Sequence, residues 1–264
     1  MSSPAHHIEN IKRNIRGGSD EDYIMPIWLA LLPYIIGVIG GAIFFFSLFA
    51  MLSAIGMGPQ QGPGMVGGPL ALSGLMLIIL IIGTILQLYV IYKFIDRRNR
   101  HIKRTLMLYE DLAALLESLG YTDAASRIRT SIREKSFEVG GEKNAILWVV
   151  LFIIFNPVVL YIFHFLNKDF RRHSIYEDRI LSELNAVLRD EGVKMIDTRR
   201  ILTIPERSTI LYIILTIVTL GFFFIYWVYV MAKDPNEHFL VHRELDMALI
   251  QSLEELLEKR EKTI

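Results

Sequence analysis

Four long apolar blocks decide which folds are open to this chain. They run from residue 27 to 55, 70 to 95, 145 to 166 and 210 to 232. A helix of about 22 residues reaches roughly 33 Å, which is about the thickness of the hydrocarbon core of a bilayer. Lys93 is the only formally charged side chain inside these blocks. We therefore predict an all-α integral membrane protein and not a soluble enzyme.

Composition excludes several further classes of protein. Lys and Arg total 28, as do Asp and Glu, so the charge balance gives no reason to expect a nucleic-acid partner. The chain has no cysteine, which excludes disulfides and thiolate metal sites. Residues 1–26 have no apolar core after a basic start, and this pattern predicts a polar cytoplasmic tail in place of a cleavable signal peptide.

The loops between the blocks predict how the first part of the chain lies in the membrane. Residues 54–69 carry no charge, whereas residues 96–144 contain ten Lys and Arg. The positive-inside rule then places the 54–69 loop outside the cell membrane and the N-terminus, 96–144 and the C-terminus in the cytoplasm. Residues 27–95 should form a spanning hairpin of a multi-pass protein. Gly37 and Gly41 form a GxxxG pattern that predicts close approach of another helix.

Three later parts of the chain resemble one another. Shifts of 72 and then 65 residues align His101, His173 and His238. The same shifts align an apolar helical face in three amphipathic segments, within 96–144, 167–209 and 233–264. The residues of this face are Leu108, Leu112, Leu116, Ile180, Leu184, Leu188, Leu245, Leu249 and Leu253. Gly120 and Gly192 follow the first two faces at positions suited to the end of a helix. We predict an internal repeat of a membrane block followed by an amphipathic helix.

This repeat raises two alternatives for blocks 145–166 and 210–232. If each block spans the membrane once, the nine Lys and Arg of residues 167–209 lie outside, against the charge rule. If each block turns back midway as a re-entrant hairpin, all three amphipathic helices stay in the cytoplasm. The expected helix-breaking residues are Gly83, Asn156, Pro157, Thr219 and Gly221. The objection to re-entry is the cost of backbone at a turn in hydrocarbon.

Basic residues follow the second and third blocks and predict contact with anionic lipid headgroups. They are Arg97, Arg98, Arg100, Lys103, Arg104, Arg171 and Arg172. The amphipathic helices that follow can either lie on the membrane or pack on one another, and the sequence leaves both possibilities open.

No catalytic or cofactor-binding residues stand out, and we expect no cofactor. His238 and His242 are four residues apart, so they share a helical face and are weak candidates for a metal site. His101 and His173 could converge with them, but an interfacial role in the headgroup zone is the expectation for these histidines. A small channel or transporter is the alternative function, with broken helices at Asn156-Pro157 and Thr219-Gly221.

The fourth block resembles a known family. Residues 207–238 contain Thr219-Leu220-Gly221 followed by Tyr226-Trp227, a pattern that resembles the prokaryotic family called domain of unknown function 4234, with a weaker echo in 143–173. The resemblance implies a small prokaryotic membrane protein and brings no activity with it. We expect a non-enzymatic membrane scaffold or accessory protein that shapes the bilayer, self-associates or joins another membrane protein.

Overall fold

The computed structural model describes residues 3–56, 64–199, 201 and 204–263, and its regular elements are all α-helices. Their order along the chain is α1 Pro4–Glu21, α2 Ile27–Gly56, α3 Gly64–Ser118, α4 Thr122–Val139, α5 Ala145–Ile154, α6 Val158–Asp190, α7 Thr209–Val218 and α8 Phe222–Thr263. The described residues contain no strand, so the prediction of an all-α protein is confirmed.

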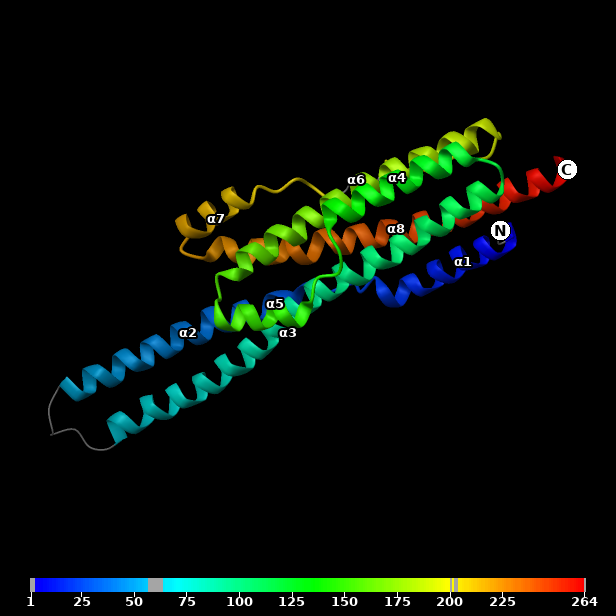
Figure 1. Cartoon of the computed structure of the whole chain (residues 1–264). Coiled ribbons are helices and arrows are strands. Elements are labelled where there is room, and N and C mark those ends of the chain that lie inside the picture. The colour runs from blue at the N-terminus through cyan, green and yellow to red at the C-terminus, as the bar shows by residue number, and fades with distance from the viewer. Residues whose placement is uncertain (1–2, 57–63, 200, 202–203, 264) are drawn as a thin grey trace.

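Helices α2 and α3 form the long hairpin that projects from one end of the molecule (Figure 1). Both are long and apolar enough to cross a membrane, by length and composition. Their close approach uses Gly40, which faces Leu80, and Gly83, which faces Ile36. Among the described residues, no neighbouring atom lies within 4 Å of a Cβ placed on Gly37 or Gly41. The predicted contact through Gly37 and Gly41 is therefore wrong within this chain. The glycine of α2 that lies against α3 is Gly40.

The predicted break at Gly83 is also wrong, since α3 continues through this residue to Ser118. The two other predicted breaks are confirmed. Block three ends its first helix at Ile154 and starts α6 at Val158, after the Asn156-Pro157 pair. Block four turns between Val218 and Phe222, with Leu220 and Gly221 at φ angles of 52° and 93°. Both blocks are thus helical hairpins, and neither is a single continuous helix.

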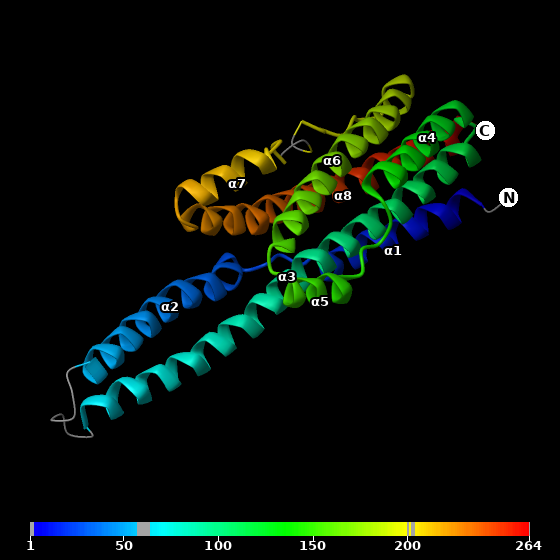
Figure 2. The ribbon, with the colours of Figure 1, turned by 60° about the vertical axis from the view of Figure 1, so that its left-hand side comes forward.

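These two short hairpins point the same way as the long one but reach less far, as both views of the ribbon show (Figures 1 and 2). Their first helices are exposed and apolar. Ile146 and Ile154 of α5 are 68% and 76% exposed, and Ile210 and Ile217 of α7 are 72% and 69% exposed. An apolar surface of this kind is unfavourable in water and suits an apolar environment.

At the opposite end lies the terminal bundle, made of α1, α4 and the C-terminal halves of α3, α6 and α8. The nine predicted face residues are all buried in its core, together with Ile8 and Ile11 of α1. The amphipathic helices therefore pack on one another and not on lipid. Gly120 and Gly192 lie just after α3 and α6 with φ angles of 92° and 65°, as the sequence predicts for residues that follow a helix.

A second apolar core lies toward the hairpins. It gathers around Phe94 of α3, Phe163 of α6 and Trp227 of α8. Along each of these three helices, a short polar stretch separates this core from the core of the terminal bundle. The candidate site occupies that polar layer.

Candidate metal centre

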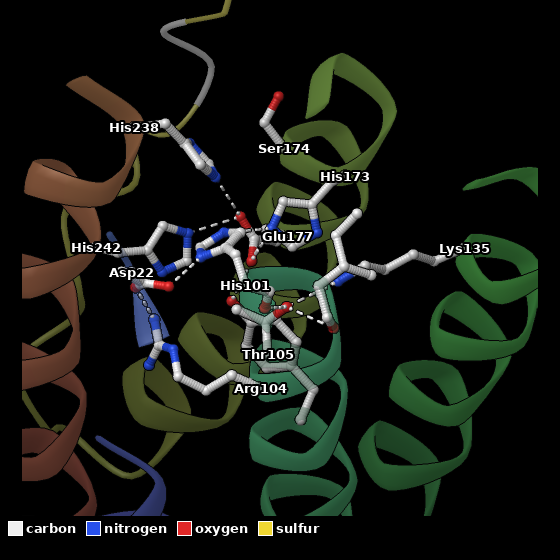
Figure 3. Close-up of polar contacts among 12 residues, drawn as sticks. Asp22, His101, Arg104, Thr105, Lys135, His173, Ser174, Glu177, His238 and His242 are labelled. Carbon is white, nitrogen blue, oxygen red and sulfur yellow. Dashed lines mark hydrogen bonds and ion pairs between the residues drawn. The ribbon is translucent and has the colours of Figure 1, made fainter. Parts of the chain in front are cut away.

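Five buried side chains from three helices gather in the polar layer (Figure 3). They are His101 from α3, His173 and Glu177 from α6, and His238 and His242 from α8. Each is at most 2% exposed. Each offers one nitrogen or oxygen atom, and these atoms all lie within 4.8 Å of one another. We call these five residues the His/Glu cluster.

Helical periodicity explains why α6 and α8 each supply two members. Residues four apart lie on the same face of a helix, so Glu177 follows His173 and His242 follows His238 toward the centre. On α3 the residue four after His101 is Thr105, whose hydroxyl donates to the carbonyl oxygens of His101 and Ile102, 3.0 and 3.1 Å away. The helix α3 therefore contributes one member and the other two helices contribute pairs.

The carboxylate of Glu177 holds the centre of the cluster. Its Oε1 lies 3.0 Å from His173 Nε2, and its Oε2 lies 2.9 Å from His242 Nε2 and 3.5 Å from His238 Nε2. Tyr109 also donates its hydroxyl to Oε1 at 3.2 Å. One carboxylate therefore faces three imidazoles in a space that water does not reach.

His101 is fixed from outside the cluster. Its Nδ1 lies 2.8 Å from Asp22 Oδ1, at the end of α1. Because a carboxylate accepts only, the proton is on Nδ1, and Nε2 keeps its lone pair toward the cluster, where it lies 2.8 Å from His173 Nε2. Asp22 is itself held by Arg104 at 2.6 Å, and Arg104 also binds Asp246 at 2.9 Å. A carboxylate behind a ligating imidazole is a common feature of metal sites, where it sets the tautomer and ring orientation.

Several nitrogens of the cluster are buried without a hydrogen-bond partner. In the described part of the chain these are Nδ1 of His173, Nδ1 of His242 and both ring nitrogens of His238. A buried polar atom left unpaired costs about 1–3 kcal/mol, so such a group requires an explanation. A metal ion bound at the centre would give His238 the partner that the protein does not supply.

The protonation states of Glu177, His173 and His238 suit metal binding, whereas the raised pKa of His242 favours a protonated ring whose proton a metal would have to displace. Burial lowers the pKa of His173 to about 4 and lowers that of His238 well below its ordinary value, so both imidazoles are neutral at pH 7. Burial alone would raise the pKa of Glu177, but His173 and His242 lower it well below its usual range. Burial likewise opposes protonation of His242, but Glu177 outweighs it and raises the pKa. Neutral imidazole and ionised carboxylate are the forms that bind metals.

The donor set indicates the class of metal. Imidazole nitrogen suits first-row divalent transition metals such as Zn²⁺, Fe²⁺ and Ni²⁺. Ca²⁺ and Mg²⁺ take oxygen ligands and would find one carboxylate here. Four imidazoles and a carboxylate therefore fit a first-row transition-metal ion.

The structure changes the interpretation of the histidines. His101, His173, His238 and His242 are buried among other side chains of the protein, so they do not face lipid headgroups as expected. Sequence reasoning identified His238 and His242 as a pair and aligned His101 with His173, but it missed Glu177 and Asp22. A signal for Glu177 exists, because the shifts of 72 and 65 residues that align the histidines also align Thr105, Glu177 and His242.

Three of the predicted headgroup residues have another role. Arg97, Arg98 and Arg104 are each 1% exposed and bind groups inside the protein, so the prediction of lipid contact is wrong for them. Arg97 donates to the carbonyl oxygen of Met231. This carbonyl has lost its helical partner, because Pro235, four residues later in α8, has no N–H group.

Arg98 joins α6 to the end of α4. It lies 2.8 Å from the carboxylate of Asp169 and donates to the carbonyl oxygen of Val139 at 2.8 Å. By contrast, Arg100 and Lys103 are exposed on α3. The remaining two predicted headgroup residues, Arg171 and Arg172, line a surface pocket on α6.

Comparison with known proteins identifies one segment of the chain. Residues 207–250 match the family described as Domain of unknown function (DUF4234). The match covers the end of the loop before α7, the whole of α7, and α8 as far as Ile250, including His238 and His242. No curated protein and no solved structure matches the chain significantly.

Proposed function

We propose that this protein is a membrane-anchored scaffold whose cytoplasmic bundle is held together by one buried first-row transition-metal ion. The observation that carries the proposal is the His/Glu cluster, in which five buried ligand atoms from three helices lie within 4.8 Å of one another. The role is non-enzymatic, so metal binding serves the stability and shape of the protein.

A structural role for the metal follows from the closed character of the site. Structural sites use protein ligands in every coordination position, whereas catalytic sites keep a position for water or substrate. The five candidate ligands are at most 2% exposed. A metal there would also link α3, α6 and α8, which are distant in sequence, and such a link stabilises a fold because it forms only in the folded state.

The membrane part of the proposal concerns the three hairpins. Helices α2 and α3 span the bilayer, and the α5–α6 and α7–α8 hairpins enter it from the cytoplasmic side and return. Helices α5 and α7 have 10 residues each, so each reaches about 15 Å, or half of the hydrocarbon core. Their exposed apolar side chains and their common direction with the long hairpin support this placement.

The internal repeat predicted from the sequence supports the metal site. The aligned residues His101, His173 and His238 form one layer, with ring centroids 4.7 to 5.4 Å apart. Repetition of a unit that carries one inward-facing histidine would bring three histidines into one layer. This juxtaposition supports the repeat independently of the leucine pattern.

Elemental analysis of the purified full-length protein tests the proposal. We expect about one equivalent of a first-row transition metal per chain, and loss of it on dialysis against a chelator should lower the unfolding temperature. The double variant His173→Ala/His242→Ala should purify without the metal. His164→Ala is the matched control, because His164 lies on α6 outside the cluster and binds Thr209 at 2.8 Å.

Two results would overturn the proposal. If wild-type protein contains no metal, and its unfolding temperature does not respond to added Zn²⁺, Fe²⁺ or Ni²⁺, the His/Glu cluster does not bind a metal. If liposomes that contain the protein take up one of these ions, the protein is a transporter and not a scaffold.

A further inference from the structure

A second polar site lies on the surface, where α6 passes the start of α7. It is a pocket of about 370 Å³. Lys168, Arg171 and Arg172 of α6 line it, together with Arg207 just before α7, and Glu206 is the acidic residue of its lining. Four cations against one carboxylate give the lining a formal charge of +3, which favours an anionic ligand.

Two of these cations have no carboxylate partner among the residues that the structure describes. Arg207 is bound to Asp234 at 2.7 and 3.0 Å, and Arg172 lies 3.5 Å from Glu138. Lys168 is exposed and has no ion-pair partner among the described residues. Arg171 donates one N–H to the carbonyl oxygen of Ile204 at 2.8 Å and has further N–H donors for a ligand.

Uncharged side chains that line the pocket hold α6 and the start of α7 together. His164 Nδ1 lies 2.8 Å from the hydroxyl oxygen of Thr209, the first residue of α7. The amide of Asn167 donates to the carbonyl oxygen of Arg207 at 3.4 Å. The start of α7 therefore lies against α6, and the positive end of the α7 dipole adds to the attraction for an anion.

The surface next to the pocket is apolar. Ile210, Ile214 and Val218 of α7 are 72%, 50% and 71% exposed. A cationic pocket beside an exposed apolar helix matches a molecule with an anionic head and hydrocarbon chains. A free phosphate would use the cations but leave the apolar surface uncovered.

We propose that this pocket binds the phosphate of an anionic phospholipid, with Lys168 and Arg171 as its ligands and the acyl chains along α7. This inference rests on the proposed position of the α7–α8 hairpin in the bilayer, and it does not depend on the metal. It assigns the lipid contact predicted for the basic residues after the third block to Arg171 and to Lys168, which lies in the same basic stretch.

Native mass spectrometry of the metal-loaded, full-length protein in detergent tests the site. The probes are phosphatidylglycerol and phosphatidic acid, with phosphatidylcholine as the lipid of no net charge and inorganic phosphate as the competitor. We expect both anionic lipids to bind at least tenfold more tightly than phosphatidylcholine. Because one basic side chain contributes about a fivefold factor near a charged lipid, Lys168→Gln should weaken binding about fivefold and Lys168→Glu more.

The control variant is Arg133→Gln/Arg243→Gln, which removes two exposed cations elsewhere in the terminal bundle and should leave lipid binding unchanged. Equal binding of all three lipids, or no effect of either Lys168 substitution, would overturn the inference. Displacement of the lipid by millimolar inorganic phosphate would show a free-phosphate site and also overturn it. Metal content of the same preparation, and topology measured by cysteine labelling in intact cells, separate these failures from failure of the proposed function.

Discussion

Asp22 and His101, 79 residues apart in the chain, meet with 2.8 Å between the carboxylate Oδ1 and the imidazole Nδ1. Both residues are at most 1% exposed. This contact couples the end of α1, just before α2, to the His/Glu cluster. It therefore ties the junction of α1 and α2 to His101, a residue that α3 already joins to the long hairpin.

The variant Asp22→Asn is expected to weaken metal binding by about 10- to 100-fold, as is typical when the carboxylate behind a ligating histidine is changed. The amide can also donate, so it no longer fixes the tautomer of His101. A competition titration with a chromophoric chelator measures the change. Asp20→Asn is the matched control, because Asp20 is exposed two residues earlier. Equal affinities for the two variants would exclude this role.

Lys135 gives a prediction about pH. Its ammonium is fully buried, 3.3 Å from the hydroxyl of Thr105, and burial lowers the pKa of Lys135 to about 8. Below pH 8 the side chain is charged in both states and folding carries the full cost of burying it. Between about pH 8 and 10.5 the unfolded chain binds more protons than the folded chain, so the free energy of unfolding should rise with pH.

The substitution Lys135→Met should remove this dependence and stabilise the protein at pH 7. The difference between about 8 and 10.5 corresponds to about 3 kcal/mol, at 1.36 kcal/mol per pKa unit. Thermal unfolding at several pH values measures the effect. Lys103→Met, at an exposed position on α3, is the control and should leave the pH dependence intact. A variant that is less stable than the wild type at pH 7 would refute the burial argument.

The core of the terminal bundle makes a third prediction. Leu249 of α8 is 0% exposed, whereas Met247, two residues earlier, is 60% exposed. Leu249→Ala should lower the free energy of unfolding by about 2–5 kcal/mol because it leaves a cavity. Met247→Ala should change it by less than about 0.5 kcal/mol. Chemical unfolding in detergent separates the two; similar small effects would mean that the face lies on lipid after all.

A fourth prediction concerns topology. The protein has no cysteine, so single cysteines at Ser182 of α6 and Gln251 of α8, both exposed, report the side of the membrane directly. If the short hairpins are re-entrant, an impermeant thiol reagent should label neither residue until cells are lysed. Glu110→Cys in α3 serves as the inside control. Gln60→Cys serves as the outside control, and this position lies outside the described residues.

Labelling of Ser182→Cys in intact cells would instead place α6 outside. The terminal bundle could not then form in one compartment, because α3, α6 and α8 share its core. Such a result would contradict both the arrangement of the bundle and the metal site.

The local properties of the sequence determine most of the helices and their ends. The apolar blocks, the Asn156-Pro157 and Thr219-Gly221 breaks and the glycines after α3 and α6 act within a few residues of their own positions. Proline without an N–H and glycine at positive φ change the backbone wherever they occur. The spacing of the leucines in the same way determines which face of each helix is buried.

Only the tertiary structure decides what the polar residues do. The burial of Arg97 depends on a carbonyl freed by Pro235 in another helix, and the role of Glu177 depends on His238 and His242, which are 61 and 65 residues away. A charge just after an apolar block has the same local pattern whether it meets lipid or a carboxylate. Its surroundings are set by how α3, α6 and α8 pack, and that packing depends on the whole chain.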